Sequence, residues 1–241
     1  MENDELAPHQ PTSRRQPLSR DLILRVAIDL MDRQGVQQLT MRQLGQALGV
    51  EAMALYHHVN GREDLLEGVV DLLVNEIRIE PGAPTPAPDG WQGLLQWVAH
   101  SVRDLAVQHP NIFPLIATRH PAAPWLRPPL RSLRVVDEFL QALVARGFTR
   151  AQAARTYRVF TSFLLGHLLL ESATLGAETS PVEEPLDEGD ADVPNQDEEL
   201  DLKEFPTLAE FRPLLQAHDT DQEFEQALEA LLNRLDLEMS Q

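Results

Sequence analysis

One short segment near the N-terminus constrains the fold more than any other part of the chain. Residues 40–48 have the pattern of a short helix, Gly49 suits a tight turn because it lacks a Cβ atom, and residues 51–59 have the pattern of a second short helix. The second helix would display one aromatic side chain and two histidines, Tyr56, His57 and His58. This layout is typical of a helix-turn-helix, whose second helix enters the major groove of DNA.

The residues around this segment predict a small three-helix core with a fourth helix behind it. Ser19 is a candidate N-cap for a first helix that ends before Gly35, and Thr40 with Gln43 three positions later has the pattern of a capping box. A further helix follows Asn60-Gly61 and extends to about residue 80. Apolar side chains that recur at helical spacing would form the core, among them Ile23, Ala27, Met31, Leu44, Leu48, Val50, Leu55, Leu65, Leu66, Val69, Val70 and Leu73.

The positions left over on the second short helix predict a contact face for DNA. Small and apolar side chains fit closely against base edges, where they read the thymine methyl group, and Tyr56 and the histidines can donate to phosphates. Arg42 and Arg62, at the starts of the flanking helices, are candidate phosphate contacts. The candidate DNA-contacting residues are Arg42, Met53, Ala54, Tyr56, His57, His58 and Arg62. The alternative for the two histidines is an ordinary surface pair, and neighbouring histidines point about 100° apart on a helix, which disfavours a metal site.

The net charge of −18 at first argues against a nucleic-acid partner, because lysine and arginine supply most non-specific affinity for DNA. The acidic residues are unevenly distributed: eleven fall between residues 178 and 202, where no basic residue occurs. The first 79 residues carry twelve acidic side chains and eight arginines, a net charge of −4. Because DNA responds to the field at the contacting face, the charge permits binding and predicts marked salt sensitivity.

The absence of several sequence features excludes some classes of protein. There are no cysteines, which excludes disulfides and thiolate chemistry. The N-terminus is acidic, unlike a signal peptide, and no apolar run approaches the ~20 residues of a membrane span, so we expect a soluble cytoplasmic protein. No glycine-rich phosphate loop, metal-spaced cluster or Gly-x-Ser-x-Gly motif occurs, so we expect neither an enzyme nor a metal or cofactor.

Apolar periodicity continues along the chain and predicts an all-α fold. The expected helices of the C-terminal part cover residues 91–108, 131–146, 150–173, 207–217 and 221–236, with a short apolar segment at 112–117. Three parts follow: a flexible leader at 1–18, a helix-turn-helix domain at 19–80, and a larger domain at 89–241 with an acidic mobile loop at 175–205. Arg14-Arg15 in the leader could instead form a basic arm that reaches DNA, and the acidic loop could instead be a docking site.

The larger domain contains a helix that is apolar on most of its faces, around residues 160–170. Such a helix needs partners on most of its faces. We expect it to pair with its symmetry mate, together with the C-terminal apolar stripe that includes Leu228 and Leu235, in a four-helix interface of a homodimer.

These residues carry a family resemblance. Residues 23–77 resemble the DNA-binding domain of the TetR (tetracycline repressor) family, in the stretches 39–44, 48–50, 54–59 and 62–66. The resemblance implies a homodimer whose two heads read half-sites of double-stranded operator DNA about one helical turn apart (~34–36 Å). It also places the family's DNA contacts on the candidate residues given above.

The larger domain resembles, over looser spacing, the effector-binding and dimerisation domain of the tetracycline-repressor class. Val98 and Val102 stand where those repressors carry a drug-binding Asn and Phe, Leu115 stands at their magnesium-binding His, and Arg78 at a drug-contacting His. These departures argue against a magnesium–tetracycline chelate and favour a small, largely apolar effector. The candidate effector-binding residues are Val98, Val102, Leu115, Thr118, Phe163 and His167, for each of which a plain core role is the alternative.

The sequence thus predicts a ligand-responsive, one-component transcriptional regulator, most often a repressor in this family, that binds operator DNA and a small-molecule effector. The alternative is a helical dimeric binding or scaffold protein with no role on DNA.

Overall fold

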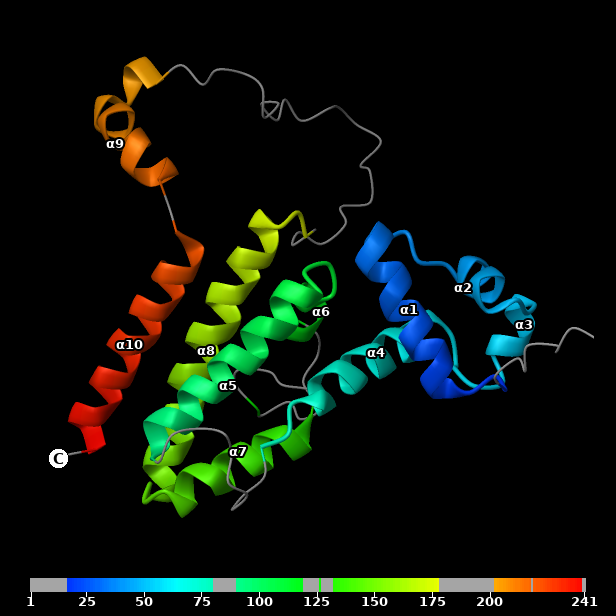
Figure 1. Ribbon diagram of the computed structural model, residues 1–241, viewed down its shortest axis with the longest axis horizontal. Coiled ribbons are helices and arrows are strands. Elements are labelled where there is room, and N and C mark those ends of the chain that lie inside the picture. The colour runs from blue at the N-terminus through cyan, green and yellow to red at the C-terminus, as the bar shows by residue number, and fades with distance from the viewer. Residues whose placement is uncertain are drawn as a thin grey trace, which may run out of the picture.

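The computed structural model describes residues 17–79, 90–118, 126, 132–177, 202–217 and 219–239. These residues form ten α-helices and one short 3₁₀ helix and contain no strand, which confirms the all-α prediction (Figure 1). Most of the expected leader and most of the acidic loop lie outside the described residues.

The N-terminal head consists of α1 (Arg20–Gln34), α2 (Met41–Leu48), α3 (Ala52–Leu55) and α4 (Arg62–Glu76). The caps form as predicted: the Ser19 hydroxyl accepts from the Leu22 amide, and Thr40 and Gln43 form a reciprocal capping box. Gly49 ends α2 in the left-handed conformation, at φ 68°. Helix α3 is shorter than expected, because the chain turns at residues 56–58, and α4 ends four residues before the predicted position.

Fully buried side chains from all four helices meet in the head. They include Ile23, Ala27, Met31, Leu44, Leu55, Leu65 and Val69. Helix α1 contacts both α2 and α4, so it lies at the centre of the head, while α2 and α3 lie on the side away from the rest of the chain (Figure 1).

The body consists of α5 (Trp91–Gln108), α6 (Phe113–Thr118), α7 (Leu133–Ala145), α8 (Arg150–Thr174) and α10 (Thr220–Met239). Helix α8 contacts each of the other four, and α10 lies along α5 and α8 (Figure 1). The 3₁₀ helix η1 (Leu202–Glu204) leads into α9 (Pro206–Gln216), in which every residue is exposed. None of the helices in the described parts of the chain is both long enough and apolar enough to cross a bilayer.

The predicted role of the C-terminal apolar stripe in the dimer interface was wrong. The C-terminal apolar stripe was expected to pair with a second copy, but Phe224, Leu228, Leu232 and Leu235 are buried within their own chain, where α10 contacts α5 and α8. Two neighbouring helices of the same chain are enough to cover a single apolar stripe. The side of α8 that stays exposed carries Val159, Ser162, Gly166 and Leu170 instead.

Candidate DNA-contacting face and body cavity

Two buried residues, Leu55 and Val59, fix the orientation of the candidate DNA-contacting segment. Leu55 and Val59 are fully buried in the head core, which turns the side chains between them outward. Met53 is 73% exposed and Tyr56 46% exposed, and His57 is exposed as well. Ala54 and His58 are half-buried, and Arg42 is exposed at the start of α2. The predicted face therefore points to solvent, away from the body.

Gly45 lets α2 and the start of α3 approach closely, a role that was not predicted from the sequence. A Cβ atom at this position would lie 2.9 Å from the Val50 carbonyl oxygen and 3.2 Å from the Ala52 amide nitrogen. Since glycine inside a helix is unfavourable by roughly 1 kcal/mol relative to alanine, its presence in α2 was an available signal of close packing.

Arg62 is engaged within the head. Its Nη2 donates to the Val36 carbonyl at 2.8 Å and its Nε to the Leu39 carbonyl at 3.5 Å. The side chain therefore ties the start of α4 to the loop between α1 and α2. Its phosphate contact stays a prediction, and only donors not already used for these bonds could serve it.

A salt bridge that no local pattern indicates fixes the turn after α3. Arg20 contacts both carboxylate oxygens of Asp64, at 2.9 and 2.7 Å, and Arg20 Nη1 also donates to the His58 carbonyl at 3.0 Å. The Asn60 amide donates to the same carboxylate at 2.7 Å. The hydrogen bonds from Arg20 and the Asn60 backbone lower the pKa of Asp64 to about 2. These hydrogen bonds fix the backbone at His58, a candidate DNA-contacting residue, and at Asn60.

The body contains an apolar cavity of about 60 Å³. Its walls come from α4 and the residues that follow it, and from α5, α6, α7 and α8. The lining residues are Val74, Ile77, Ile79, Val98, Val102, Leu105, Ile116, Val135, Val136, Phe139, Tyr157, Phe160, Thr161, Leu164 and Leu165. None of them carries a charge, and only Tyr157 and Thr161 have a polar group in the side chain. Such a lining suits an uncharged, apolar group.

Two of the six predicted effector residues line this cavity and four do not. Val98 and Val102 are in its wall. Phe163 and His167 lie on a different side of α8, where their rings contact Phe224 of α10 at 6.4 and 5.3 Å between centroids. Thr118 is exposed at the end of α6 and donates to the Pro114 carbonyl. Leu115 lies beside a polar pocket between the head and the body.

Helix α4 belongs to both the head and the cavity. Its residues Leu65, Leu66 and Val69 are in the head core, whereas Val74, one turn further, lines the cavity. Near its end, the Asn75 side chain accepts from the Ser132 hydroxyl at 3.0 Å and from Arg134 Nη2 at 3.0 Å. One continuous helix therefore connects the cavity wall to the head core.

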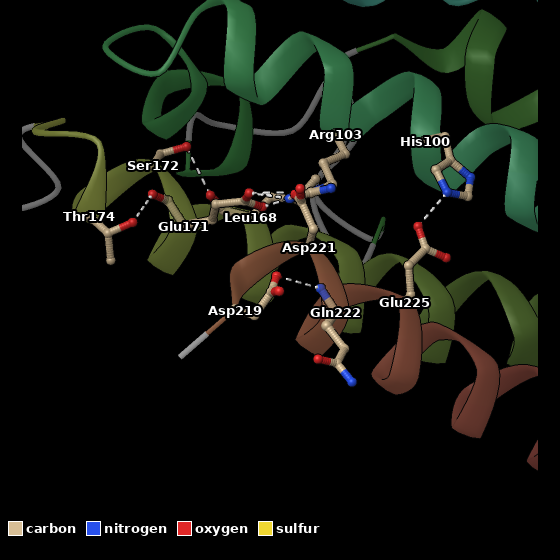
Figure 2. Close-up of polar contacts among 10 residues, drawn as sticks. All are labelled: His100, Arg103, Leu168, Glu171, Ser172, Thr174, Asp219, Asp221, Gln222 and Glu225. Atoms are coloured by element: carbon tan, nitrogen blue, oxygen red, sulfur yellow. Dashed lines mark hydrogen bonds and ion pairs between the residues drawn. The ribbon is translucent and has the colours of Figure 1, made fainter. Parts of the chain in front are cut away.

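A group of charged residues fastens α10 to the rest of the body (Figure 2). Arg103 of α5 donates to Glu171 of α8, with Nη2 to Oε1 at 2.7 Å, and also to Asp221 of α10. The guanidinium lies 4.8 Å from the centre of the Phe224 ring. Further along, His100 Nε2 lies 2.7 Å from Glu225 Oε1. Burial lowers the pKa of His100, but its hydrogen bonds to Glu225 and to the Gln96 carbonyl outweigh burial, so that the pKa is raised.

In the described part of the chain, no three His, Asp or Glu side chains gather as they would around a metal ion.

Two family models match the chain. The one described as "Bacterial regulatory proteins, tetR family" matches residues 23–69, and the one described as "Tetracyclin repressor-like, C-terminal domain" matches residues 83–237. An HTH-type transcriptional regulator of Saccharopolyspora erythraea is 30% identical over 161 residues, which span 66% of this chain and 64% of that regulator, a little under two thirds of its length. The class D tetracycline repressor of Escherichia coli is 25% identical over 224 residues, 92% of this chain and 91% of the repressor.

Solved structures of TetR family proteins have a similar fold. A possible TetR family transcriptional regulator of Streptomyces coelicolor A3(2) superposes with a TM-score of 0.67 at 28% identity, covering 91% of this chain and 99% of the other. The TetR family protein ActR of Streptomyces coelicolor, solved in complex with actinorhodin, has a TM-score of 0.66 at 22% identity, covering 94% of this chain and 100% of ActR.

Proposed function

The chain belongs to the TetR family of bacterial regulatory proteins, and we propose that it is a ligand-responsive transcriptional repressor that acts in the cytoplasm. In this proposal a homodimer binds a palindromic operator through its two heads, and a small, largely apolar effector releases it.

The DNA-binding part of the proposal is supported by the geometry of α3. The helix lies on the side of the head away from the body (Figure 1), and Met53, together with Tyr56 directly after the helix, is exposed to solvent. Met53 and Ala54 would contact base edges, and Tyr56, His57 and Arg42 would contact phosphates or bases.

The effector-binding part is supported by the uncharged lining of the body cavity, which includes the predicted residues Val98 and Val102. ActR, a protein of the same fold, was crystallised with actinorhodin, a small molecule. An uncharged cavity disfavours a magnesium chelate, because a divalent ion requires oxygen ligands and compensating charge.

The observation that carries the regulatory link is that α4 is shared between the head core and the cavity wall. An effector that binds one position of Val74 and Ile77 better than another biases the angle of α4 and so the separation of the two heads. A differential of 1–3 kcal/mol, typical of allosteric coupling, changes operator occupancy by about 5- to 150-fold.

The test is a fluorescence anisotropy titration with duplex DNA from upstream of the chain's own coding sequence. We expect the double variant Tyr56→Ala, His57→Ala to lose at least tenfold in affinity, about 1.4 kcal/mol. The control is Gln37→Ala, Gln38→Ala, two exposed residues of the same head that lie outside the candidate DNA-contacting face. If the Tyr56→Ala, His57→Ala variant kept full affinity while remaining a folded dimer, the DNA-contacting assignment would be wrong. A chain that bound no DNA at all would favour the alternative of a dimeric binding or scaffold protein.

A further inference from the structure

The body cavity is too small, as it stands, to hold an effector of ordinary size. Its volume is about 60 Å³, whereas sites for small molecules usually measure ~300–1,000 Å³. An effector must therefore either widen the cavity or occupy additional space connected to it.

Such space lies directly outside the cavity, between α7 and α8. A groove of about 530 Å³ is lined by Leu126, Leu133, Val136, Asp137, Leu140, Ala154, Tyr157 and Arg158. Two of these residues, Val136 and Tyr157, also line the cavity. The two spaces therefore adjoin at these two side chains, which form a shared wall.

Tyr157 is the larger part of that wall. The side chain is buried, its ring contacts Phe139 edge-on at 6.3 Å between centroids, and burial raises its pKa to about 12. A change in its side-chain rotamer would join the groove to the cavity without displacing a helix, because rotamer changes need no movement of the backbone.

The groove differs from the cavity in charge. It is lined by apolar side chains together with Asp137 and Arg158. The Asp137 carboxylate already accepts a hydrogen bond from Gln141 Nε2 at 2.6 Å. In the described part of the chain, the Arg158 guanidinium forms no hydrogen bond or ion pair, and its side chain is exposed. An uncommitted guanidinium at the rim of an apolar groove favours a carboxylate or a similar planar anion.

We propose that the groove between α7 and α8 is the outer half of the effector site, and that the effector is an amphiphile whose anionic end pairs with Arg158 while its apolar end passes Tyr157 into the cavity. This inference rests on the proposed function and specifies its ligand class: an apolar ring system or acyl chain that carries one acidic group.

A matched pair of fluorescent probes tests the two halves separately. Phenyl-naphthylamine is uncharged, and anilinonaphthalene sulfonate has nearly the same ring system with one anionic group. Each is titrated into the full-length protein and into Arg158→Gln, with Arg150→Gln, an exposed arginine at the start of the same helix, as the control. We expect Arg158→Gln to weaken binding of the sulfonate by about two- to fivefold, the usual effect of losing an exposed ion pair, and to leave binding of the neutral probe unchanged.

The outcomes separate this inference from the proposed function. If the neutral probe binds saturably but Arg158→Gln changes both probes equally, or neither, the anionic half of the site is refuted while the apolar effector cavity stands. If neither probe binds saturably, both proposals fail. An equal loss of the sulfonate in Arg150→Gln would indicate a general charge effect and would also refute the inference.

The gate is tested by association kinetics in a stopped-flow instrument. Tyr157→Ala removes the ring from the wall and should raise the association rate of the neutral probe at least severalfold, whereas Tyr157→Phe keeps the ring and should raise that rate less. Equal rates in all three proteins would exclude entry past Tyr157. Helical content and thermal unfolding, measured in parallel, establish that each variant is folded.

Discussion

The carboxylate of Asp32 in α1 lies 2.8 Å from the His109 imidazole, Oδ2 to Nδ1, and so joins the head to the end of α5. The neighbouring Asn111 side chain donates to the Asp32 backbone carbonyl at 3.1 Å. The other carboxylate oxygen, Oδ1, is buried without a hydrogen-bond partner. Burial raises the pKa of Asp32, and the hydrogen bond to His109 opposes that rise. Burial therefore destabilises the ionised form of Asp32, and the hydrogen bond to His109 offsets part of this destabilisation.

His109→Ala should consequently destabilise the protein, since it leaves Asp32 without its partner. We expect the free energy of unfolding at pH 7 to fall by about 1–3 kcal/mol, the usual effect of an unsatisfied buried polar group. Asp32→Ala should cost less in the His109→Ala background than alone, by more than the ~0.5 kcal/mol within which independent sites add. Urea denaturation of the two single variants and the double variant measures this coupling, and additive effects would mean that the pair is not coupled.

Asp64 should give the head an acid-sensitive component of stability. Its folded-state pKa, about 2, is lower than the ordinary value of 3.8, so ionised Asp64 stabilises the fold at pH above about 4 and that contribution is lost as the pH falls toward 2. The shift alone corresponds to roughly 2.5 kcal/mol. We expect Asp64→Asn to cost only about 1 kcal/mol at pH 7, because the Arg20 side chain is 43% exposed and solvent screens the pair.

The measurement is chemical denaturation of both proteins at several pH values. The difference between them should be largest near neutral pH and should shrink below pH 4. A difference that did not change with pH would assign the effect to packing rather than to ionised Asp64.

Gly45→Ala should disturb the approach of α2 to α3. The new Cβ would lie 2.9 Å from the Val50 carbonyl oxygen, a backbone atom that cannot move without shifting the turn. We expect a loss of about 1–3 kcal/mol in unfolding free energy, as for other overpacked sites, and weaker operator binding. Gln46→Ala, an exposed neighbour on the same helix, is the control and should stay within about 0.5 kcal/mol of the unaltered protein. If both variants were equally stable, the contact would be easily relieved.

The features predicted correctly from the sequence depend on residues close together in the chain. Thr40 and Gln43 are three positions apart, and the capping box follows from that spacing. Gly49 adopts its left-handed conformation beside the helix it ends. Apolar periodicity located the helices of the described regions, in most cases to within a few residues, because all of them except α9 bury one face.

The features that were missed depend on the rotation of helices and on residues far apart in sequence. Phe163 and His167 share α8 with the cavity residues Thr161 and Leu164, but they face α10, and helical spacing alone cannot assign either direction to the cavity. Arg20 and Asp64 are separated by two helices, so no local pattern connects them. The apolar stripe of α10 identified a buried face but not whether its own chain or a second copy covers it.

The two candidate phosphate contacts should behave differently. Arg42 is exposed, so Arg42→Gln should weaken operator binding and reduce the slope of log Kd against log salt by about 2 for the dimer, which loses one phosphate contact in each of its two heads, with no change in stability. Arg62 donates to the Val36 and Leu39 carbonyls, so Arg62→Gln should also lower the unfolding free energy by about 1 kcal/mol. Salt titrations and urea denaturation of both variants separate the two roles. Unchanged stability in Arg62→Gln would show that the hydrogen bonds to the two carbonyls contribute little.

Arg103 should contribute to stability mainly through the buried Glu171 of α8, and much less through its contact with Asp221 of α10. Glu171 is only 6% exposed, and removal of Arg103 would leave its carboxylate buried without a countercharge (Figure 2). We expect Arg103→Ala to cost about 3 kcal/mol or more, as when one partner of a buried ion pair is removed. Asp221 is 84% exposed, so Asp221→Ala should cost less than about 1 kcal/mol although it contacts the same guanidinium. Thermal and urea denaturation of the two variants measure the contrast. Equal losses would mean that the link to α10, rather than the burial of Glu171, determines the contribution of Arg103.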